Sequence, residues 1–190
     1  MPKKNEQVLE FLLSRRSHSA RLLAEPVPDK KDLELILTAA SRCPDHGKLE
    51  PWRFIVIQKK SLPALAIKLS EIGKKKDLDG SKLKKSVDLF SEASLIVAVI
   101  FSPKYSEKIP EIEQKLSTGA VCVSLLNAAH AAGWGANWLT GWMAFDEDFL
   151  ISGLGLTEGE FVAGFVHIGT PSQTPLERPR PDTRSITSWF

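Results

Sequence analysis

The chain has 190 residues, of which 43% are hydrophobic and 25% are charged, with 25 basic against 23 acidic side chains. A net charge of +2, with lysines interleaved among acidic residues, argues against an extended basic surface for nucleic acid. The composition is that of one globular domain, which at this size buries about 70% of its unfolded surface without a disulfide or metal.

Apolar periodicity and capping residues predict the elements of the first half of the chain. In order they are a helix capped by Asn5 and ending near Ser14, a helix capped by Asp29 and stopped by Pro44, a strand from about Trp52 to Gln58, and two lysine-rich helices around Gly80 within residues 61–91. Pro44, Gly47 and Pro51 punctuate the loop that precedes the strand.

The second half is more apolar, and its pattern predicts a sheet centre and a buried helix. In order the elements are a strand at 93–101, a helix from Pro110 to about His130, a short strand with a loop at 135–142, a short helix from Asp146 to Gly153, and a strand at 161–169. The strand at 93–101 is apolar on both faces, so we expect it at the centre of a sheet. This order of elements predicts one α+β domain.

Cysteine usage and the long uncharged segment bear on cellular location. Cys43 and Cys122 each lie in an apolar stretch expected to be helical, without metal-ligand spacing, and are read as reduced core residues of a cytoplasmic protein. The basic N-terminus has no cleavage site, which argues against a signal peptide. Residues 117–145 carry no Asp, Glu, Lys or Arg, but their alanine, glycine and polar content favours a buried helix and strand over a membrane span.

Several common catalytic signatures are missing from the sequence. There is no GxGxxG after a strand, no GxxxxGK[ST], no HExxH and no GxSxG, so the dinucleotide-wrapping, P-loop, zincin and serine-hydrolase classes have no support. His130 on an apolar helix and His167 in an apolar strand are better explained as core residues than as catalysts. We predict no metal site.

Two pairs of arginines are the first positive sign of a ligand. Arg15, Arg16 and Ser17 follow the first helix and offer forked donors and a hydroxyl, which suit a phosphate or carboxylate. The same cations also complement the negative end of that helix, which is the simpler explanation of the motif alone. Arg178 and Arg180 form a second pair in a proline-spaced segment, and together the pairs favour a phosphate-bearing ligand.

At this point the sequence resembles the FMN-dependent nitroreductase family. The resemblance is carried, in order, by SRRSHSARL near the N-terminus, AASRCPDHGKLEPWRFIVI, AAHAAGWGANWLTGW, VHIGTP, and a basic proline-rich arm. The PDHGKLEPWRF segment is similar to that of the short-chain subgroup. Each motif is weak alone, but the ordered set covers nearly the whole chain.

The resemblance implies a nitroreductase-like α+β sandwich: a central mixed or antiparallel sheet flanked by helices, in an obligate homodimer. It implies FMN in clefts between the subunits and a C-terminal arm that embraces the partner. We therefore expect residues 1–190 to form a single domain, with 171–190 as the exchanged arm. A helix that is apolar all round, and a proline-rich tail that ends in Trp189 and Phe190, agree with this expectation.

By resemblance the flavin carries the chemistry and no side chain is an obligate catalyst. The cofactor-binding residues it implies are Arg15, Arg16 and Ser17 at the phosphate and ribityl region, Arg42 and His46 toward the flavin of the partner, Trp138, Leu139 and Thr140 along the ring, and Arg178 and Arg180 at the phosphate. Ser19 is counted with them, at a position where many members carry a lysine near the pyrimidine edge. Asp88 stands where many members carry an asparagine.

The activity that the resemblance implies is NAD(P)H-dependent oxidoreduction through FMN. Hydride would pass from the nicotinamide to flavin N5, and electrons would then pass to a small organic acceptor such as a nitroaromatic or a quinone. Two alternatives stay open: a non-catalytic flavin-binding module, and a flavin-consuming or dehalogenating enzyme on the same fold. The expected partners are a second copy and the small-molecule acceptor, with no nucleic acid and no membrane.

Overall fold

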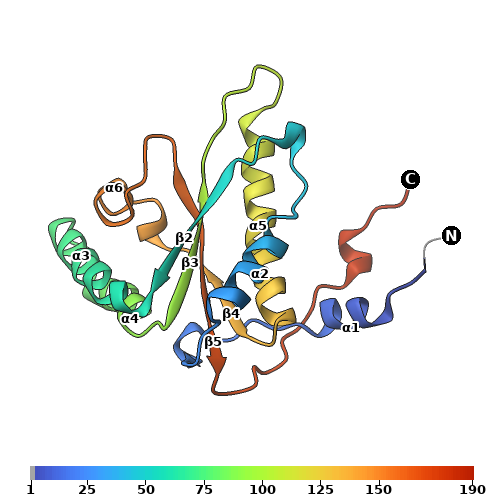
Figure 1. Ribbon diagram of the computed structural model, residues 1–190, viewed down its shortest axis with the longest axis horizontal. Coiled ribbons are helices and arrows are strands. Elements are labelled where there is room, and N and C mark those ends of the chain that lie inside the picture. The colour runs from blue at the N-terminus through green and yellow to red at the C-terminus, as the bar shows by residue number, and fades with distance from the viewer. Residues whose placement is uncertain (1–2) are drawn as a thin grey trace.

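Strand β3 (Leu95–Phe101) lies at the centre of the structure, and all seven of its side chains are buried. The computed structural model describes residues 3–190. A strand with no exposed face requires a covering layer on both sides of its sheet, and helices supply both layers (Figure 1). The central strand predicted from the apolar run at 93–101 is thus confirmed.

Six α-helices and five strands form the regular structure of the described residues. The helices are α1 (Glu6–Ser14), α2 (Lys30–Ala40), α3 (Leu62–Lys75), α4 (Gly80–Ser91), α5 (Glu111–Ala131) and α6 (Glu147–Leu154). The strands are β1 (Leu23–Ala24), β2 (Trp52–Gln58), β3, β4 (Gly135–Leu139) and β5 (Phe161–Pro171). All except β1 match elements predicted from the sequence, and the α+β class is confirmed.

The five strands form one antiparallel sheet. Its order is β1-β5-β3-β2, and β4 also pairs with β5. The long strand β5 binds β3 along its first part and β1 at its end, where Leu23 pairs with Pro171 and Ala24 with Thr170. This last pairing holds the segment after α1 beside the start of the C-terminal arm, although the two are far apart in the sequence.

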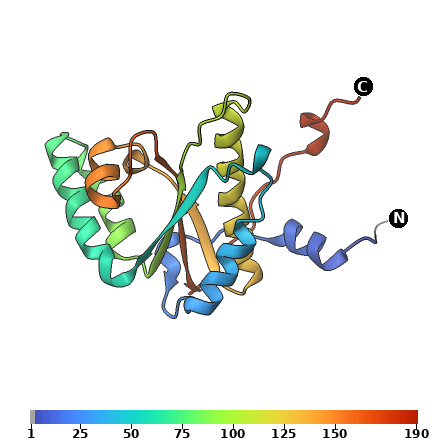
Figure 2. The same ribbon diagram turned by 45° about the horizontal axis from the view of Figure 1, so that its top comes forward.

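Alternate side chains of β3 enter two separate hydrophobic cores. On one face, beneath α3, α4 and α6, Phe90 makes edge-to-face contacts with Phe149 and Phe165 at ring-centroid distances of 5.8 and 5.2 Å. On the other face, α2 and α5 pack against the sheet, and Val97 of β3 and Leu125 of α5 are fully buried in this second core. Figure 2 shows the sheet between these two helical layers.

Four helices begin at side chains that accept a backbone hydrogen bond, as expected for N-caps. The carboxylate of Asp29 accepts from the Asp32 N–H at 2.8 Å, and that of Asp146 accepts from the Phe149 N–H at 3.0 Å. The side chains of Asn5 and Asp79 do the same for α1 and α4. The caps predicted at Asn5, Asp29 and Asp146 are confirmed.

Three segments expose apolar side chains on the surface. None of the residues of α1 is buried, and α1 projects on the same side of the domain as the C-terminal arm (Figure 1). Trp189 in the arm is 92% exposed, and on α5 the outward-facing Ile112, Leu116 and Val123 are 60, 67 and 45% exposed. Exposed apolar surface of this extent is typical of an interface with another protein.

Within residues 3–190 no helix has the length and apolar content needed to cross a membrane.

The expectation that both cysteines lie in helices is wrong for Cys43. Cys122 is buried within α5, but Cys43 lies in the loop after α2, where Pro44 prevents the helix from continuing. Its thiol contacts the Ser117 backbone oxygen at 3.7 Å. Burial raises the pKa of the Cys122 thiol to about 12 and also raises the pKa of Cys43, so both thiols stay protonated.

A bidentate ion pair joins β2 to the loop before β5. The Arg53 guanidinium donates to both carboxylate oxygens of Glu160 at 2.7 Å, and the Glu160 side chain is only 6% exposed. The hydrogen bonds from Arg53 are the main cause that lowers the pKa of Glu160 from 4.5 to about 2. A carboxylate with a lowered pKa stabilises the fold above its ordinary pKa, and this contribution is lost as the pH falls toward 2.

Glu160→Gln should therefore lower the free energy of unfolding at pH 7 by about 2 kcal/mol, because a partly buried charge-assisted pair is broken. The difference from the wild type should shrink between pH 4.5 and 2, as Glu160 becomes protonated. Urea unfolding at a series of pH values measures both effects. Glu6→Gln, which removes an exposed ion pair with Lys4, is the control and should change little. A Glu160→Gln deficit that is the same at pH 7 and pH 2.5 would contradict this account.

Candidate functional site

The segment that follows α1, residues 15–19, which we call the arginine segment, is held along strand β4. The backbone N–H of Arg15 closes α1 by donating to Phe11 O at 2.8 Å, and the chain then becomes extended. The His18 N–H donates to Ala136 O at 3.1 Å, and the side-chain amide of Asn137 donates to His18 O. These bonds fix residues 15–18 against the sheet and prevent them from continuing the helix.

Two guanidinium groups share a single carboxylate here, and a third guanidinium, that of Arg15, lies close to both. Arg16 Nη1 lies 3.2 Å from Glu177 Oε1, and Arg180 Nη2 lies 3.0 Å from the same oxygen. Burial first, and then the neighbouring Arg180 and Arg16, lower the pKa of Arg15. We call Arg15, Arg16, Arg180 and Glu177 the arginine cluster. With three cations and one anion it carries a net positive charge.

Two donors of the arginine cluster are buried without a partner. In the described part of the chain, neither Arg15 Nη1 nor Arg16 Nε has a hydrogen bond. Leaving a buried donor unpaired costs about 1–3 kcal/mol, so such atoms are typical of a binding site whose ligand supplies the acceptors. A phosphate monoester offers several acceptor oxygens and negative charge, and it fits both the geometry and the charge of the cluster.

Trp138, Leu139 and Thr140, which the resemblance places along the flavin ring, lie at the end of β4. The Trp138 indole is committed to the sheet: its Nε1 donates to Ala163 O at 3.1 Å, and its ring covers Gly164, where a Cβ would lie 2.1 Å from Nε1. Leu139 is half-buried and Thr140 is exposed. Trp138 is thus used for packing, whereas Leu139 and Thr140 continue the strand edge that begins beside the arginine segment.

Arg42 and His46 lie at the other end of α5. His46 Nδ1 is 2.7 Å from Glu113 Oε2, in the first turn of α5, and the Arg42 side chain is exposed. The arginine segment instead lies beside His130, in the last turn of the helix. Glu113 and His130 are 17 residues apart, which corresponds to about 25 Å along a helix. Within one chain the structure therefore does not bring Arg42 and His46 to the arginine cluster.

The remaining predicted residues are exposed. Ser17 and Ser19 lie on the arginine segment, and the Ser19 backbone oxygen accepts from the Leu22 N–H at 2.9 Å. The backbone N–H of Arg178 donates to Glu177 Oε1 at 2.9 Å, while its guanidinium faces solvent. Ser17 and Arg178 thus flank the cluster without making a hydrogen bond through their side chains in residues 3–190.

Asp88 on α4 is neutralised by two cations. Lys84 Nζ lies 2.8 Å from Asp88 Oδ2, and Arg21 Nη2 lies 3.7 Å from the same oxygen. The Asp88 side chain is only 19% exposed, so this carboxylate is held against α4 and the segment after α1. Its negative charge is compensated locally, and Asp88 offers little free charge to a ligand.

Three residues of this region escaped the sequence analysis: Glu177, His18 and His130. The rings of His18 and His130 stack with centroids 5.5 Å apart and planes 19° apart. The sequence predicts His130 as a core residue, but it is only half-buried and lies beside the arginine segment. Its position in the last turn of a helix, after a run of alanines, carried no signal of a second histidine from another element.

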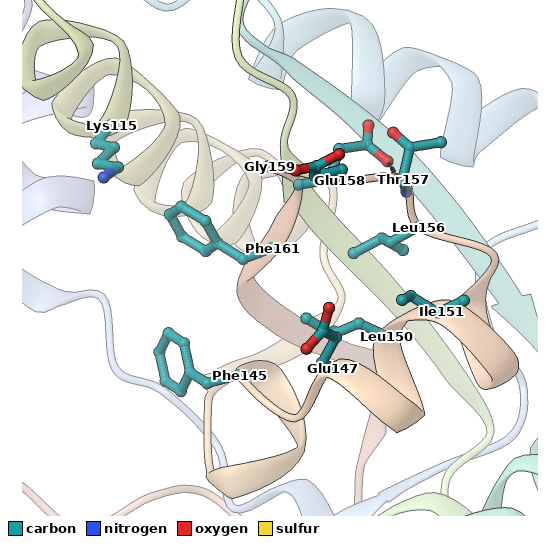
Figure 3. A pocket seen from close by; sticks show the side chains of 11 residues that line it. Lys115, Phe145, Glu147, Leu150, Ile151, Leu156, Thr157, Glu158, Gly159 and Phe161 are labelled. Carbon is teal, nitrogen blue, oxygen red and sulfur yellow. Dashed lines mark hydrogen bonds between the residues drawn. The ribbon is translucent and has the colours of Figure 1, made fainter.

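A separate apolar recess of about 430 Å³ opens near the N-terminal part of α5. In Figure 3, Phe145 and Phe161 face this recess with their rings, whose centroids are 6.4 Å apart. Lys115 of α5 lies 6.0 Å from the Phe161 ring, within the range of a cation–π contact. The recess has the chemistry to accept a flat apolar group. It is at the end of α5 that carries His46, away from the arginine cluster.

Neither the cluster nor the recess has the composition of a metal site. Among residues 3–190 no three His, Cys, Asp or Glu side chains gather in a way that could hold a metal ion. The arginine cluster is built from donors, which bind anions.

Comparisons with known sequences agree on one family. Residues 12–170 match the model of the Nitroreductase family. The chain is 31% identical over 176 residues to YdjA of Escherichia coli (strain K12), which is named as a provisional NAD(P)H nitroreductase, and the match covers 91% of this chain and 94% of YdjA. A relative in Haemophilus influenzae (strain Rd), named in the same provisional way, is 36% identical over 165 residues, covering 85% of this chain and 87% of its own.

Solved structures show the same fold. A nitroreductase-like family protein from Bacillus cereus has a TM-score of 0.81 and 22% identity, with 100% of this chain and 99% of the other covered. A nitroreductase with bound FMN from Bacteroides fragilis has a TM-score of 0.75 and 21% identity, over 98% of this chain and 100% of the other. The nitroreductase-like sandwich expected from the sequence is confirmed.

The charge balance of the arginine cluster gives a direct test. Glu177→Gln removes its only anion, so inorganic phosphate should bind about five- to tenfold more tightly, equivalent to about 1 kcal/mol. Titration calorimetry at low salt measures the change. Asp182→Asn is the matched control, because Asp182 pairs with Arg184 on the same arm but outside the cluster. An unchanged phosphate affinity in Glu177→Gln would mean that the cluster does not face the anion.

Proposed function

This chain belongs to the nitroreductase family, and from that premise we propose that it is an FMN-dependent oxidoreductase with NAD(P)H as its co-substrate. Relatives named as NAD(P)H nitroreductases and a family structure with bound FMN support this assignment. The observation that carries it is the arginine cluster, whose buried and unpartnered donors match a phosphate monoester such as that of FMN.

In this proposal Arg15, Arg16 and Arg180 hold the phosphate of FMN, with Ser17 and Arg178 beside them. Leu139, Thr140 and Ser19 lie along the ring, and Trp138 sets the course of β4 by packing on Gly164. When bound, FMN supplies the two-electron chemistry of a ping-pong cycle, from a reduced nicotinamide to a small organic acceptor such as a nitroaromatic or a quinone. The protein contributes binding, orientation and a positive field at the phosphate end of the site.

We further propose that the site is completed by a second copy of the chain. The arginine cluster lies at the C-terminal end of α5, while Arg42, His46 and the apolar recess lie at its N-terminal end. A two-fold axis that packs two α5 helices antiparallel brings opposite ends together and covers their exposed apolar side chains. Arg42 and His46 of one copy then face the FMN held by the other.

Residues 1–190 are proposed to form a single domain, with 171–190 as an arm that packs on the partner. One sheet with continuous cores on both faces supports the single domain. The free thiols of Cys43 and Cys122 are typical of a reducing compartment, and we propose a cytoplasmic location on that ground.

The assignment is tested by the absorbance spectrum of the purified protein, identification of any released flavin, and NADH and NADPH oxidation with a nitroaromatic or quinone acceptor. We expect FMN, reduction of the flavin by at least one nucleotide, and acceptor-dependent turnover. A protein that binds FMN without being reduced by either nucleotide is a flavin-binding module, which would overturn the enzymatic assignment. Flavin fragmentation or dehalogenated products would instead indicate the flavin-consuming or dehalogenating alternative.

Arg15→Ala should weaken FMN binding by about 1.5–3 kcal/mol, the range for a charge-assisted hydrogen bond, because it removes a buried phosphate donor. Quenching of flavin fluorescence measures the dissociation constant. Arg184→Ala is the control, since Arg184 lies on the arm and is 91% exposed. Equal FMN affinity in Arg15→Ala and the wild type would contradict a phosphate contact. It would favour the simpler explanation, in which the arginines only complement the negative C-terminal end of α1.

Truncation after Thr174 should weaken the dimer and FMN binding together, because a ligand bound between subunits stabilises their association. A shorter truncation after Asp182 keeps Arg178 and Arg180 and should affect the dimer more than the phosphate contacts. Analytical ultracentrifugation and flavin fluorescence report the two properties. A stable, fully flavinated dimer after truncation at Thr174 would show that the arm is not part of the site.

A further inference from the structure

Two histidines from distant parts of the chain stack directly behind the arginine cluster. His18 lies in the arginine segment, and His130 lies in the last turn of α5. Their ring centroids are 5.5 Å apart, and the planes differ by 19°. Neither residue is among the cofactor-binding positions implied by the family resemblance, so their arrangement requires a separate explanation.

The hydrogen bonds of His130 show where its proton lies. Nδ1 is 2.6 Å from Leu126 O, and because a carbonyl oxygen can only accept, Nδ1 carries the hydrogen. Nε2 is buried and has no hydrogen-bond partner in the described residues, and the backbone of Arg16 lies near the ring. In the neutral tautomer that this bond requires, Nε2 is unprotonated and cannot donate to the nearby backbone oxygen of Arg16.

Burial and the charges around His130 both disfavour a positive charge on its ring in the free chain. Burial is the largest cause that lowers its pKa, and the positive charge of Arg15 and the neighbouring His18 add to it. The backbone oxygens of Leu126 and Arg16 act in the opposite direction and favour the protonated ring. Farther out, Arg16 and Arg180 share Glu177, so the cluster as a whole still repels a further cation.

A bound phosphate reverses this balance. A phosphate monoester brings up to two negative charges to Arg15, Arg16 and Arg180, which removes the electrostatic opposition to a proton on His130. Leu126 O already accepts from Nδ1–H, and the backbone oxygen of Arg16 would then accept from Nε2–H. His18 lacks a comparable pair of acceptors: its Nδ1 is buried without a partner in residues 3–190, and burial lowers its pKa.

We propose that His130 is a positioning residue of the phosphate site, which takes up a proton on Nε2 when a phosphate monoester binds to the arginine cluster. The proton comes from solvent and no other bond changes. The new Nε2–H donates to Arg16 O and ties the arginine segment to α5, just where Arg16 contributes its guanidinium. This inference rests on the proposed function for the identity of the ligand, FMN.

The consequence is a proton linkage of definite sign. Binding of FMN raises the affinity of His130 for a proton, so by reciprocity protonation of His130 raises the affinity for FMN as the pH falls. The phosphate itself acts in the opposite direction, because arginines favour its dianion and promote proton release near its second pKa of about 6. Net proton uptake on binding at pH 7.5 is therefore a specific sign of an imidazole.

Titration calorimetry with FMN and the apoprotein in two buffers of different ionisation enthalpy measures the number of protons exchanged. For the wild type at pH 7.5 we expect net uptake of about half a proton per FMN. His130→Gln keeps a side-chain donor but cannot become charged, so it should lose the uptake. The ratio of the dissociation constants of His130→Gln and the wild type should grow at least about threefold between pH 8 and pH 6.

Two further measurements keep the test decisive. The His18→Gln variant should retain the proton uptake on FMN binding. If His18→Gln loses this uptake while His130→Gln retains it, the assignment to His130 is overturned. If His130→Gln does not fold, ¹⁵N NMR of the wild-type histidine side chains should show His130 Nε2 about half protonated at pH 7.5 with FMN and unprotonated without it, with Nδ1 protonated in both states. An Nε2 that stays unprotonated in the complex would overturn the inference.

The outcomes separate this inference from the proposed function. Failure of FMN to bind at any pH would contradict the proposed function, and the linkage with it. FMN binding with equal proton exchange in the wild type and His130→Gln would overturn only the role of His130.

Discussion

The complete burial of strand β3 is the constraint on which the rest of the structure depends. Since its side chains enter cores on both faces, the sheet requires helices on both sides, and α5 is the main cover of one of them. The inner face of α5 packs against this core, while Ile112, Leu116 and Val123 on its outer face are exposed. A second apolar face on a long helix is stabilised when another surface covers it, and in the proposed dimer a second copy of the chain covers this face.

The two ends of α5 carry different parts of the proposed site. The arginine cluster borders the C-terminal end because the pairing of β1 with the end of β5 draws residues 15–22 and the arm to the same place. Arg42 and His46 border the N-terminal end, about 25 Å away. Binding and assembly are therefore coupled in this account: the FMN phosphate neutralises one chain's cluster, and association of two chains supplies the remaining contacts.

Local patterns in the sequence were sufficient for most of the fold and part of the site. Caps such as Asp29 and Asp146, and the apolar run of β3, act within a few residues and could be predicted. The meeting of Arg15 with Arg180 was implied only by the family resemblance, since it depends on the two-residue strand β1, which has no periodicity to detect. The stacked His18 and His130 depend on the same non-local pairing, so no local signal marked them.

The most direct test of a site shared between two copies is complementation in mixed dimers. Two double variants are needed: one carries Arg15→Ala with Arg16→Ala, and the other carries Arg42→Ala with His46→Ala. In the homodimer of either variant both sites are damaged. In a refolded equimolar mixture, half of the dimers are hybrids, and each hybrid has one intact site and one with both defects. The account predicts that about one quarter of all sites regain wild-type FMN affinity. No recovery above the level of the separate variants would contradict the shared site.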